Sequence, residues 1–369
     1  MINNIETIPM NLEKIPETFK KRCFNASIIK YSGKTLMFYR IMDPLTHISE
    51  VYSAQLNQKF QIIPLTNKKI EISPQLSKKG YCFEDPRAFI FKKRLFLCCC
   101  AHNPPSALAG IIYLELDKNL KVKSVYIPNY GNNSRNFINP QNSKASRIKF
   151  LKNHRFMEKN WQFFENEDKL FFIYSIEPHK VIEINQNKIL KEYPSSADFW
   201  WKFGIPRGST PPVKINNEFL SFFHSSVSKG KNKIYSVGAY TFSPNPPFKI
   251  TKITKSPIIS GDKINTSKLA VIFPSGAILE NNSWVVSCGY NDESIKIIKF
   301  SHDSLLKLLT PIKRTSTKEK INRIALKSLV IIPNKKYNEM YIELNRLIGK
   351  VGISLRKNHP KLYKNLKKN

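Results

Sequence analysis

The chain repeats one phrase five times: a short polar or charged segment, an apolar strand, a short turn and a second apolar strand. The turns read SGK, KKR, NEDK, NNE and NNS, and such small polar residues commonly connect β-hairpins. The copies occupy residues 25–40, 84–100, 158–175, 207–226 and 273–292. Helical periodicity is almost absent before about residue 300. This pattern predicts an all-β fold, a five-bladed β-propeller, because the alternative, a β-sandwich, does not naturally produce five similar hairpins.

The end of the chain differs from the repeats. From residue 313 onward there are 16 Lys and Arg against three Glu, a net charge of +13. We therefore predict a propeller domain over residues 1–310 and a basic, partly helical extension over residues 311–369. A helix expected at 338–349 has one apolar face, which could rest on an anionic membrane surface or pack on the main domain.

Composition narrows the class of protein. The 369 residues are 41% hydrophobic and 12% aromatic, which excludes a disordered or fibrous chain. The sequence shows no apolar run of the roughly 20 residues needed to span a membrane and no secretory signal. We expect a cytoplasmic protein with six reduced cysteines, peripheral membrane contact through the basic tail being one interpretation. The net charge of +33 favours anionic partners, but no nucleic-acid-binding module is visible, so no nucleic acid is expected.

In a propeller, the first residues of each repeat converge on the central channel. The ends of the second strands add further polar and aromatic side chains there. These strand ends are Arg40, His102, Tyr174, His224, Tyr290 and Asp292. This set of side chains is typical of a sugar-binding site, because carboxylates and amides hydrogen-bond hydroxyl groups and an aromatic ring covers the face of a pyranose. The set suits glycosyl transfer in particular, where one carboxylic acid moves a proton and an oxocarbenium-like centre is stabilised.

Five ordered phrases resemble a known family. They are NASIIKYSGKTLMFYR, FEDPRAFI, EKNW followed by LFFIYSIEPH, RGSTPPV with FFHSS, and FPSGAI with GYND. FEDPR is the most specific. The chain resembles the five-bladed propeller of glycoside hydrolase family 130, whose members are mostly β-mannoside phosphorylases, with some hydrolases and a related branch of mannosyltransferases. Nothing after about residue 310 shares this resemblance.

The resemblance implies an inverting enzyme that acts on mannosides. Asp85 matches the general acid, which in this family protonates the glycosidic oxygen through a hydroxyl of the bound mannose. Lys159 matches a phosphate-binding lysine, and Arg40 and Asp292 match sugar-binding residues. The full predicted sugar-binding set is Asn25, Arg40, Glu84, Arg87, Glu158, Asn160, Trp161, Tyr290 and Asp292. A predicted anion site consists of Arg155, Lys159, Arg207 and His224, and could hold phosphate, a sugar phosphate or the diphosphate of a nucleotide sugar.

Some residues depart from the phosphorylase pattern. Tyr174-Ser175 stands where phosphorylases have His-Arg, and a dianionic phosphate needs several convergent cations. In a simple inverting hydrolase, a second carboxylate would lie about 6.5–9.5 Å from the acid, and Glu158 and Glu177 are the candidates. Several residues also have a purely structural interpretation: Glu84-Asp85-Pro86-Arg87 as a turn, and Trp161 as packing between blades.

The sequence therefore predicts a carbohydrate-active enzyme with Asp85 as acid, a glycosyltransferase or phosphorylase of surface-glycan metabolism. A non-catalytic carbohydrate-binding propeller is the alternative, and a basic nucleic-acid scaffold ranks last. We predict no cofactor and no metal, since no metal-ligand spacing or phosphate loop occurs. The sugar, its linkage, the acceptor and the oligomeric state are left open.

Overall fold

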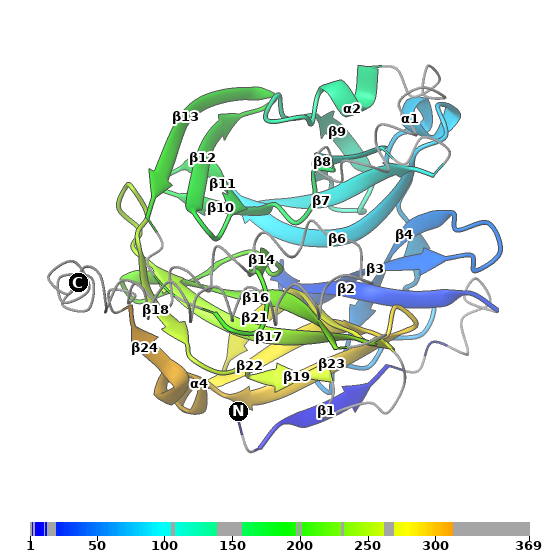
Figure 1. Cartoon of the computed structure of the whole chain (residues 1–369). Coiled ribbons are helices and arrows are strands. Elements are labelled where there is room, and N and C mark those ends of the chain that lie inside the picture. The colour runs from blue at the N-terminus through cyan, green and yellow to red at the C-terminus, as the bar shows by residue number, and fades with distance from the viewer. Residues whose placement is uncertain are drawn as a thin grey trace, which may run out of the picture.

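The computed structural model describes residues 2, 4–10, 12, 20–104, 108–138, 157–196, 199, 201–229, 232–261 and 269–312. These residues form five β-sheets and a few short helices, an all-β propeller. Figure 1 shows strands β2, β6, β10, β14, β16 and β21 nearest the middle of the molecule, with the outer strands of each sheet at the periphery. The prediction of an all-β propeller is confirmed.

Three consecutive repeats form four-stranded antiparallel sheets whose strands follow chain order from the inside outward. The first sheet is β2 (Arg22–Tyr31), β3 (Lys34–Met42), β4 (Ser49–Leu56) and β5 (Lys68–Lys69). The second is β6 (Cys82–Phe91), β7 (Arg94–Asn103), β8 (Leu108–Leu116) and β9 (Val122–Tyr126). The third is β10 (Gln162–Asn166), β11 (Lys169–Ser175), β12 (His179–Asn185) and β13 (Lys188–Ser195).

The last sheet joins the two ends of the propeller domain. Its inner strands come from the fifth repeat, and its outermost strand is β1, near the N-terminus, which pairs antiparallel with β23. The strands are β21 (Ile272–Glu280), β22 (Ser283–Tyr290), β23 (Ser294–Ser301) and β1 (Glu6–Pro9). Because one sheet uses strands from opposite ends of the sequence, the ring is closed by main-chain hydrogen bonds.

The fourth repeat departs from the predicted blade and corrects the expectation of five equivalent blades. It forms an eight-stranded sheet, so four sheets are regular blades. Its inner strand is split between β14 and β15 at residues 209–212, where Pro211 and Pro212 supply no backbone N–H. The strands are β14 (Arg207–Gly208), β15 (Val213–Ile215), β16 (Glu218–Lys229), β17 (Asn232–Phe242), β18 (Ile250–Thr254), β19 (Ile259–Ser260), β20 (Leu269–Ala270) and β24 (Leu309–Pro311).

The core lies between adjacent sheets, where the apolar faces of neighbouring blades meet. One cluster joins Phe38 and Val51 of the first sheet to Leu97 and Ile112 of the second. All six cysteines are buried free thiols. Three of them, Cys98, Cys99 and Cys100, fill consecutive positions of β7 with at most 1% of their surface exposed. The aliphatic and aromatic strands of the repeats therefore fill the spaces between blades.

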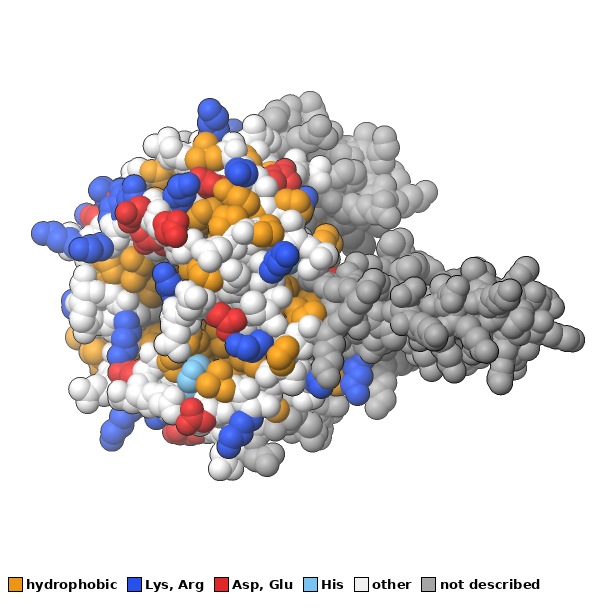
Figure 2. Space-filling view, turned by 90° about the vertical axis from the view of Figure 1, so that its left-hand side faces the viewer, with side chains coloured by type: hydrophobic (Ala, Val, Ile, Leu, Met, Phe, Trp, Pro, Cys, Tyr) orange, Lys and Arg blue, Asp and Glu red, His pale blue; other side chains and the backbone are white. Residues whose placement is uncertain are grey.

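The helices are short: α1 (Pro74–Lys78), α2 (Arg135–Ile138) and α4 (His302–Leu308). No helix in the described ranges is long and apolar enough to cross a membrane. The helix predicted at 338–349, and the extension from residue 313 onward, lie outside the described residues. Figure 2 shows one face of the molecule, on which Lys and Arg side chains are interspersed with Asp and Glu.

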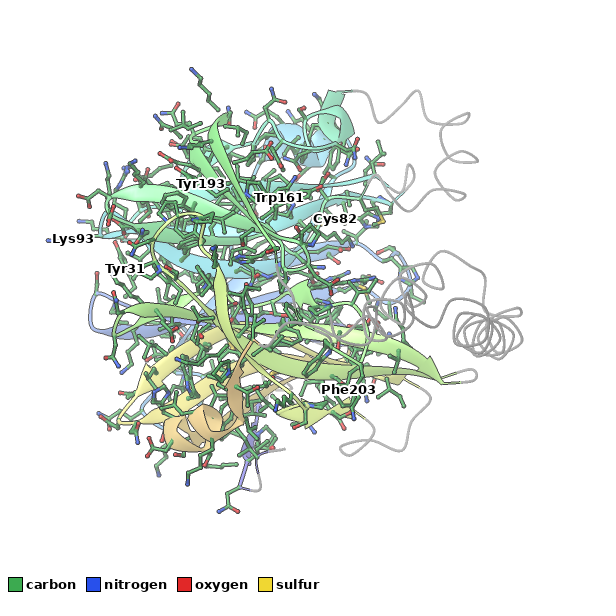
Figure 3. The ribbon with its side chains drawn as sticks, turned by 60° about the vertical axis from the view of Figure 1, so that its left-hand side comes forward. Tyr31, Cys82, Lys93, Trp161, Tyr193 and Phe203 are labelled. Atoms are coloured by element: carbon green, nitrogen blue, oxygen red, sulfur yellow. The ribbon has the colours of Figure 1, made fainter. Side chains whose placement is uncertain are left out.

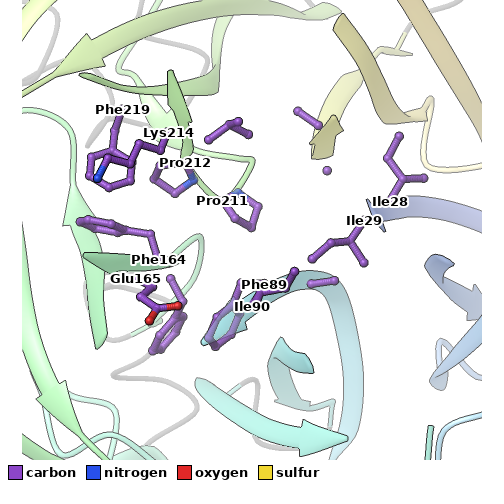
Figure 4. Close-up of a pocket in the computed structure, with 15 residues that line it drawn as sticks. Ile28, Ile29, Phe89, Ile90, Phe164, Glu165, Pro211, Pro212, Lys214 and Phe219 are labelled. Atoms are coloured by element: carbon purple, nitrogen blue, oxygen red, sulfur yellow. The ribbon is translucent and has the colours of Figure 1, made fainter. Parts of the chain in front are cut away.

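The two ends of the propeller differ in polarity. At the end where the inner hairpins turn, a cavity of about 250 Å³ is bounded by all five sheets. Its walls are mainly apolar, as Figure 4 shows, with Ile28, Phe89, Phe164 and Pro211 among them. Figure 3 places Tyr31 and Lys93 toward this end and Cys82 toward the opposite one. The first residues of the inner strands, which carry the predicted chemistry, therefore lie at the polar end.

Candidate active site

Three inner strands begin with the same backbone distortion. Asn25, Asp85 and Asn160 occupy equivalent places in the first three repeats and have φ angles of 51°, 51° and 66°. The pairing register shifts between Phe24 and Ser27 and again between Glu84 and Arg87, so β2 and β6 each have a bulge there. Asn and Asp tolerate the left-handed conformation better than most residues. The Asn or Asp of these three repeats is thus explained by the backbone as well as by chemistry.

Asp85 is held by side chains from the first blade. The amide Nδ2 of Asn25 donates a hydrogen bond of 2.7 Å to Oδ1 of Asp85. The guanidinium Nη1 of Arg40 lies 3.5 Å from the same oxygen. Asp85 is 9% exposed. Its carboxylate is therefore fixed at one oxygen by two partners.

Glu84, the neighbour of Asp85, is the charge centre of this end of the channel. Its Oε1 accepts a hydrogen bond of 2.9 Å from Nη2 of Arg40, and its Oε2 lies 3.4 Å from Nζ of Lys159. Nδ1 of His102 lies 3.2 Å from Oε1. Three blades thus contribute to one cluster, since Arg40 is on β3, Glu84 and His102 are on β6 and β7, and Lys159 precedes β10.

The cluster keeps its members charged despite burial. Burial by itself would raise the pKa of Glu84, but Arg40, His102 and Lys159 lower it well below its usual range. Burial by itself would lower the pKa of Lys159, but Cys100, Glu84 and Asp85 raise it. His102 has its pKa raised to about 9, because contact with Cys82 and Glu84 outweighs its burial. Lys159 and His102 are therefore two cations next to Glu84, and their side chains are partly exposed.

Asp292 joins the same electrostatic group from the last blade. Its φ of 55° places it in the turn between β22 and β23. Burial and the nearby carboxylates of Asp85 and Glu84 raise its pKa, while Arg40 opposes them. The structure therefore brings Arg40, Glu84, Asp85, Asp292 and Lys159 to one place.

Arg87 was predicted to bind sugar, but its surroundings are those of a structural residue. It is 1% exposed, and its Nε donates to the main-chain oxygen of Ser209 at 2.6 Å. Its Nη2 donates to Oδ1 of Asn160 at 3.0 Å, and its guanidinium lies over the ring of Phe273. Arg87 connects four sheets, so the structure places it as a brace behind Asp85. Asn160 uses its amide oxygen in that brace.

Glu158 and Trp161 lie in a separate cluster. Oε1 of Glu158 accepts a hydrogen bond of 2.9 Å from the backbone N–H of Asn132 and lies 3.4 Å from the Tyr174 hydroxyl. Burial raises the pKa of Glu158. Trp161 is fully buried and stacks on Phe172 with centroids 4.4 Å apart. Trp161 therefore packs in the core and offers no open face to a sugar. This agrees with the interpretation of Trp161 as a packing residue between blades.

The predicted anion site is only partly assembled. Lys159 is in the cluster described above, and Arg207 is exposed at the start of β14. His224 is buried, and burial together with Arg207, Arg87 and Lys233 lowers its pKa well below the usual value. Its Nδ1 lies 2.7 Å from Oγ of Ser209. The neutral ring supplies no positive charge to an anion, which corrects the role predicted for His224.

Three other predicted residues remain. Arg155 lies outside the described residues. Tyr290 is half-buried, and the ammonium of Lys296 lies 3.7 Å from the centre of its ring. Glu177 lies in the turn between β11 and β12, before a cis proline.

Sequence reasoning placed His102 among the strand ends at the channel without giving it a specific role, and it missed Cys82 and Gly289. His102 contacts Glu84 from the end of β7, and its position at a strand end was the available signal. Cys82 lies directly opposite His102. Gly289 lies against Asn25, since a Cβ at this glycine would come within 1.8 Å of Oδ1 of Asn25. No motif marks Cys82 or Gly289, because only the pairing of strands and the packing of blades place them here.

Buried carboxylates and cations converge at one end of this propeller, and the family match assigns the chain to the class of carbohydrate-active enzymes. The sequence belongs to the family described as β-1,4-mannooligosaccharide phosphorylase, glycoside hydrolase family 130, which matches residues 2–311. A comparison with curated proteins found no match.

Solved structures share the fold. The β-1,2-mannobiose phosphorylase of Listeria innocua, in complex with β-1,2-mannobiose, has a TM-score of 0.57 at 14% identity, over 83% of this chain and 99% of that chain. A mannose phosphorylase from Leishmania mexicana, in complex with phosphate, has a TM-score of 0.54 at 11% identity, over 84% and 92% of the two chains. A glycosyl hydrolase from Bacteroides ovatus has a TM-score of 0.55 at 13% identity, over 80% and 87%.

Proposed function

We propose that this protein is an inverting phosphorylase of β-linked mannosides in which Asp85 is the general acid. The observation that carries the proposal is the setting of Asp85. It is a nearly buried carboxylate on a strained bulge of an inner strand, fixed by Asn25 and Arg40 at one oxygen. A fixed carboxyl group at the polar end of the channel is what proton transfer to a glycosidic oxygen requires.

In this mechanism Asp85 gives a proton to the glycosidic oxygen, by way of a hydroxyl of the bound mannose. The bond from C1 to that oxygen breaks, and the leaving sugar departs with the proton. Phosphate attacks C1 from the opposite face, so a β-mannoside yields α-mannose 1-phosphate. In this proposal Arg40 and Asp292 hold sugar hydroxyls, and phosphate binds the partly exposed cations Lys159 and His102.

Family membership supports an enzyme over the two non-catalytic interpretations of the sequence. It also supports mannosides as the substrate class, because the family is described by its action on mannooligosaccharides. Among the described residues, only Lys159 and His102 would support binding of a nucleotide-sugar donor. The experiments below distinguish such a donor from phosphate.

The test is reverse phosphorolysis. The purified protein is incubated with α-mannose 1-phosphate and a panel of sugar acceptors, and phosphate release is followed by phosphorus NMR. We expect release by the wild type and a loss of about 100-fold or more in Asp85→Asn. The matched control is Asp168→Asn, which makes the same change in an exposed turn, and it should keep full activity. Absence of release with every acceptor, or an Asp85→Asn variant as active as wild type, contradicts the proposal.

One observation favours hydrolysis as the second candidate. Glu158 is a buried carboxyl group whose pKa is raised, and it meets Tyr174 where phosphorylases carry His-Arg. Such a group could take a proton from an attacking water. Release of mannose from β-mannobiose in phosphate-free buffer, abolished in both Asp85→Asn and Glu158→Gln, would establish hydrolysis in place of phosphorolysis. Mannosyl transfer from nucleotide sugars alone would point to the transferase branch.

A further inference from the structure

We propose that Cys82, Glu84 and His102 form a binding site for a thiophilic divalent metal ion such as Zn²⁺. The Sγ atom of Cys82, a carboxylate oxygen of Glu84 and a ring nitrogen of His102 all lie within 4.8 Å of one another. Among the residues that the structure describes, no other three potential ligands of these types gather so closely. Cys82 is placed toward the polar end of the propeller in Figure 3.

The antiparallel pairing of β6 and β7 creates this arrangement. Cys82 and Glu84 are two positions apart on β6, so their side chains share one face of the strand. His102 is the direct partner of Cys82 on β7, and Cys100 is the partner of Glu84. The three ligands therefore belong to two paired strands inside a sheet, which holds them more rigidly than a loop could.

The buried Nδ1 of His102 makes an ion pair with Oε1 of Glu84, 3.2 Å away, but no hydrogen bond of good geometry with any described residue. The thiol of Cys82 donates only a weak hydrogen bond to the main-chain oxygen of His102, at 3.3 Å. A bound metal would give both atoms a strong partner.

The donor set selects the kind of metal. Nitrogen, oxygen and sulfur ligands at about 2.0–2.3 Å are those of Zn²⁺, whereas Mg²⁺ and Ca²⁺ prefer oxygen alone. Ligands at these distances lie about 3.5 Å apart in a tetrahedron, so side-chain shifts of roughly 1 Å would complete the site. Gly80, Tyr81, Cys82 and Pro104 border an adjacent groove of about 500 Å³, from which water could supply the fourth ligand.

Cys82 would bind the metal as a thiolate, and its thiol proton would leave to solvent. Glu84 would then share its carboxylate between the metal and its present partners, Arg40 and Lys159. Since Arg40 also contacts Asp85, metal binding would disturb the acid and inhibit the enzyme.

The experiment titrates the full-length protein with Co²⁺, which replaces Zn²⁺ and reports thiolate ligation by a charge-transfer absorption in the near ultraviolet. We expect this absorption in the wild type and its loss on adding Zn²⁺, while excess Mg²⁺ leaves it unchanged. Cys82→Ser should abolish it, and His102→Gln should weaken Co²⁺ affinity at least about tenfold. Cys23→Ser is the matched control, because Cys23 and Cys82 are both 5% exposed, and it should keep the absorption.

Lack of the absorption in the wild type, or its persistence in Cys82→Ser, overturns the proposal. Circular dichroism shows whether each variant is folded, and His102→Gln decides the question if Cys82→Ser is not. The readout does not use enzymatic activity, so the metal site and the proposed phosphorylase function can fail independently.

Discussion

Asn25 of the first blade donates a 2.7 Å hydrogen bond to Asp85 of the second, and both residues have a φ of 51°. The donor and the acceptor thus lie on equivalent bulges of two neighbouring inner strands. Their relation ties the orientation of the proposed acid to the packing between blades. We therefore expect a substitution at either bulge to lower enzymatic activity more than it lowers the stability of the fold.

Removing the Asn25 side chain should lower activity. We choose Asn25→Gly because glycine keeps the left-handed backbone without strain. Hydrogen bonds to charged groups contribute about 1.5–3 kcal/mol, so kcat/KM should fall roughly ten- to hundredfold. Steady-state kinetics measure this. Asn281→Gly, the same change at a φ of 47° in the turn between β21 and β22, should leave kcat/KM unchanged, and an equal loss in both variants would refute the assignment.

Neutralising Glu84 should destabilise the protein. Glu84→Gln leaves Arg40, Lys159 and His102 without their shared carboxylate, and breaking a buried ion pair in this way costs about 3–5 kcal/mol. The pKa of His102 should also fall from about 9. Urea denaturation and NMR titration of the imidazole check the two effects. Glu50→Gln, which loses a half-exposed pair with Lys69, should cost at most about 1 kcal/mol.

Gly289 should not accept a side chain. A Cβ there would lie 1.8 Å from Oδ1 and 2.9 Å from the backbone nitrogen of Asn25. We expect Gly289→Ala to lower the free energy of unfolding by about 2 kcal/mol and to reduce kcat/KM by displacing Asn25 from Asp85. Gly33→Ala is the control: its φ of 74° predicts backbone strain of about 1 kcal/mol, yet nothing lies within 4 Å, so activity should not change. Full activity in Gly289→Ala would contradict the argument.

His179 should make stability depend on pH. It is fully buried, its Nδ1 lies 2.9 Å from the main-chain oxygen of Phe248, and burial lowers its pKa to about 4 from the ordinary 6.5. The unfolded chain binds a proton between these values and the folded protein does not. Stability should therefore fall as the pH drops from about 6.5 to 4, by about 3 kcal/mol at most. Denaturation across this range should show a smaller fall for His179→Gln, and an unchanged slope would exclude His179 as the cause.

The repeated hairpin could be predicted from sequence because it depends on local chemistry: strand alternation and polar turns. The eight-stranded fourth sheet could not. Its hairpin β16–β17 continues past the blade and pairs with β19 and β20, and such pairing joins segments that the sequence keeps apart. Pro211 and Pro212 coincide with the break between β14 and β15. How the neighbouring strands pair around that break depends on tertiary contacts.

Some features of the candidate site could likewise be predicted from the sequence, and others could not. Residues at the start of a repeat, such as Asn25 and Asp85, were predicted to converge on the channel, and the structure brings these two into contact. Trp161, Arg87 and His224 were predicted at the channel on the same grounds. In the structure Trp161 is buried in the core, Arg87 forms a brace between blades, and His224 is buried with its pKa lowered. The direction of a side chain beside a bulge depends on backbone angles that residue identity alone does not fix.

The sequence by itself determined a ring of hairpins and indicated that the acids and cations at the start of each repeat lie at one end of a channel. Both follow from the two-residue period of strands and from the order of the repeats along the chain. Only the tertiary structure decided that Glu84 would hold Arg40, His102 and Lys159 together, and that Cys82 would face His102. The reason is physical: these contacts arise from strand register and from the packing of one blade against the next, which involve residues up to 75 positions apart.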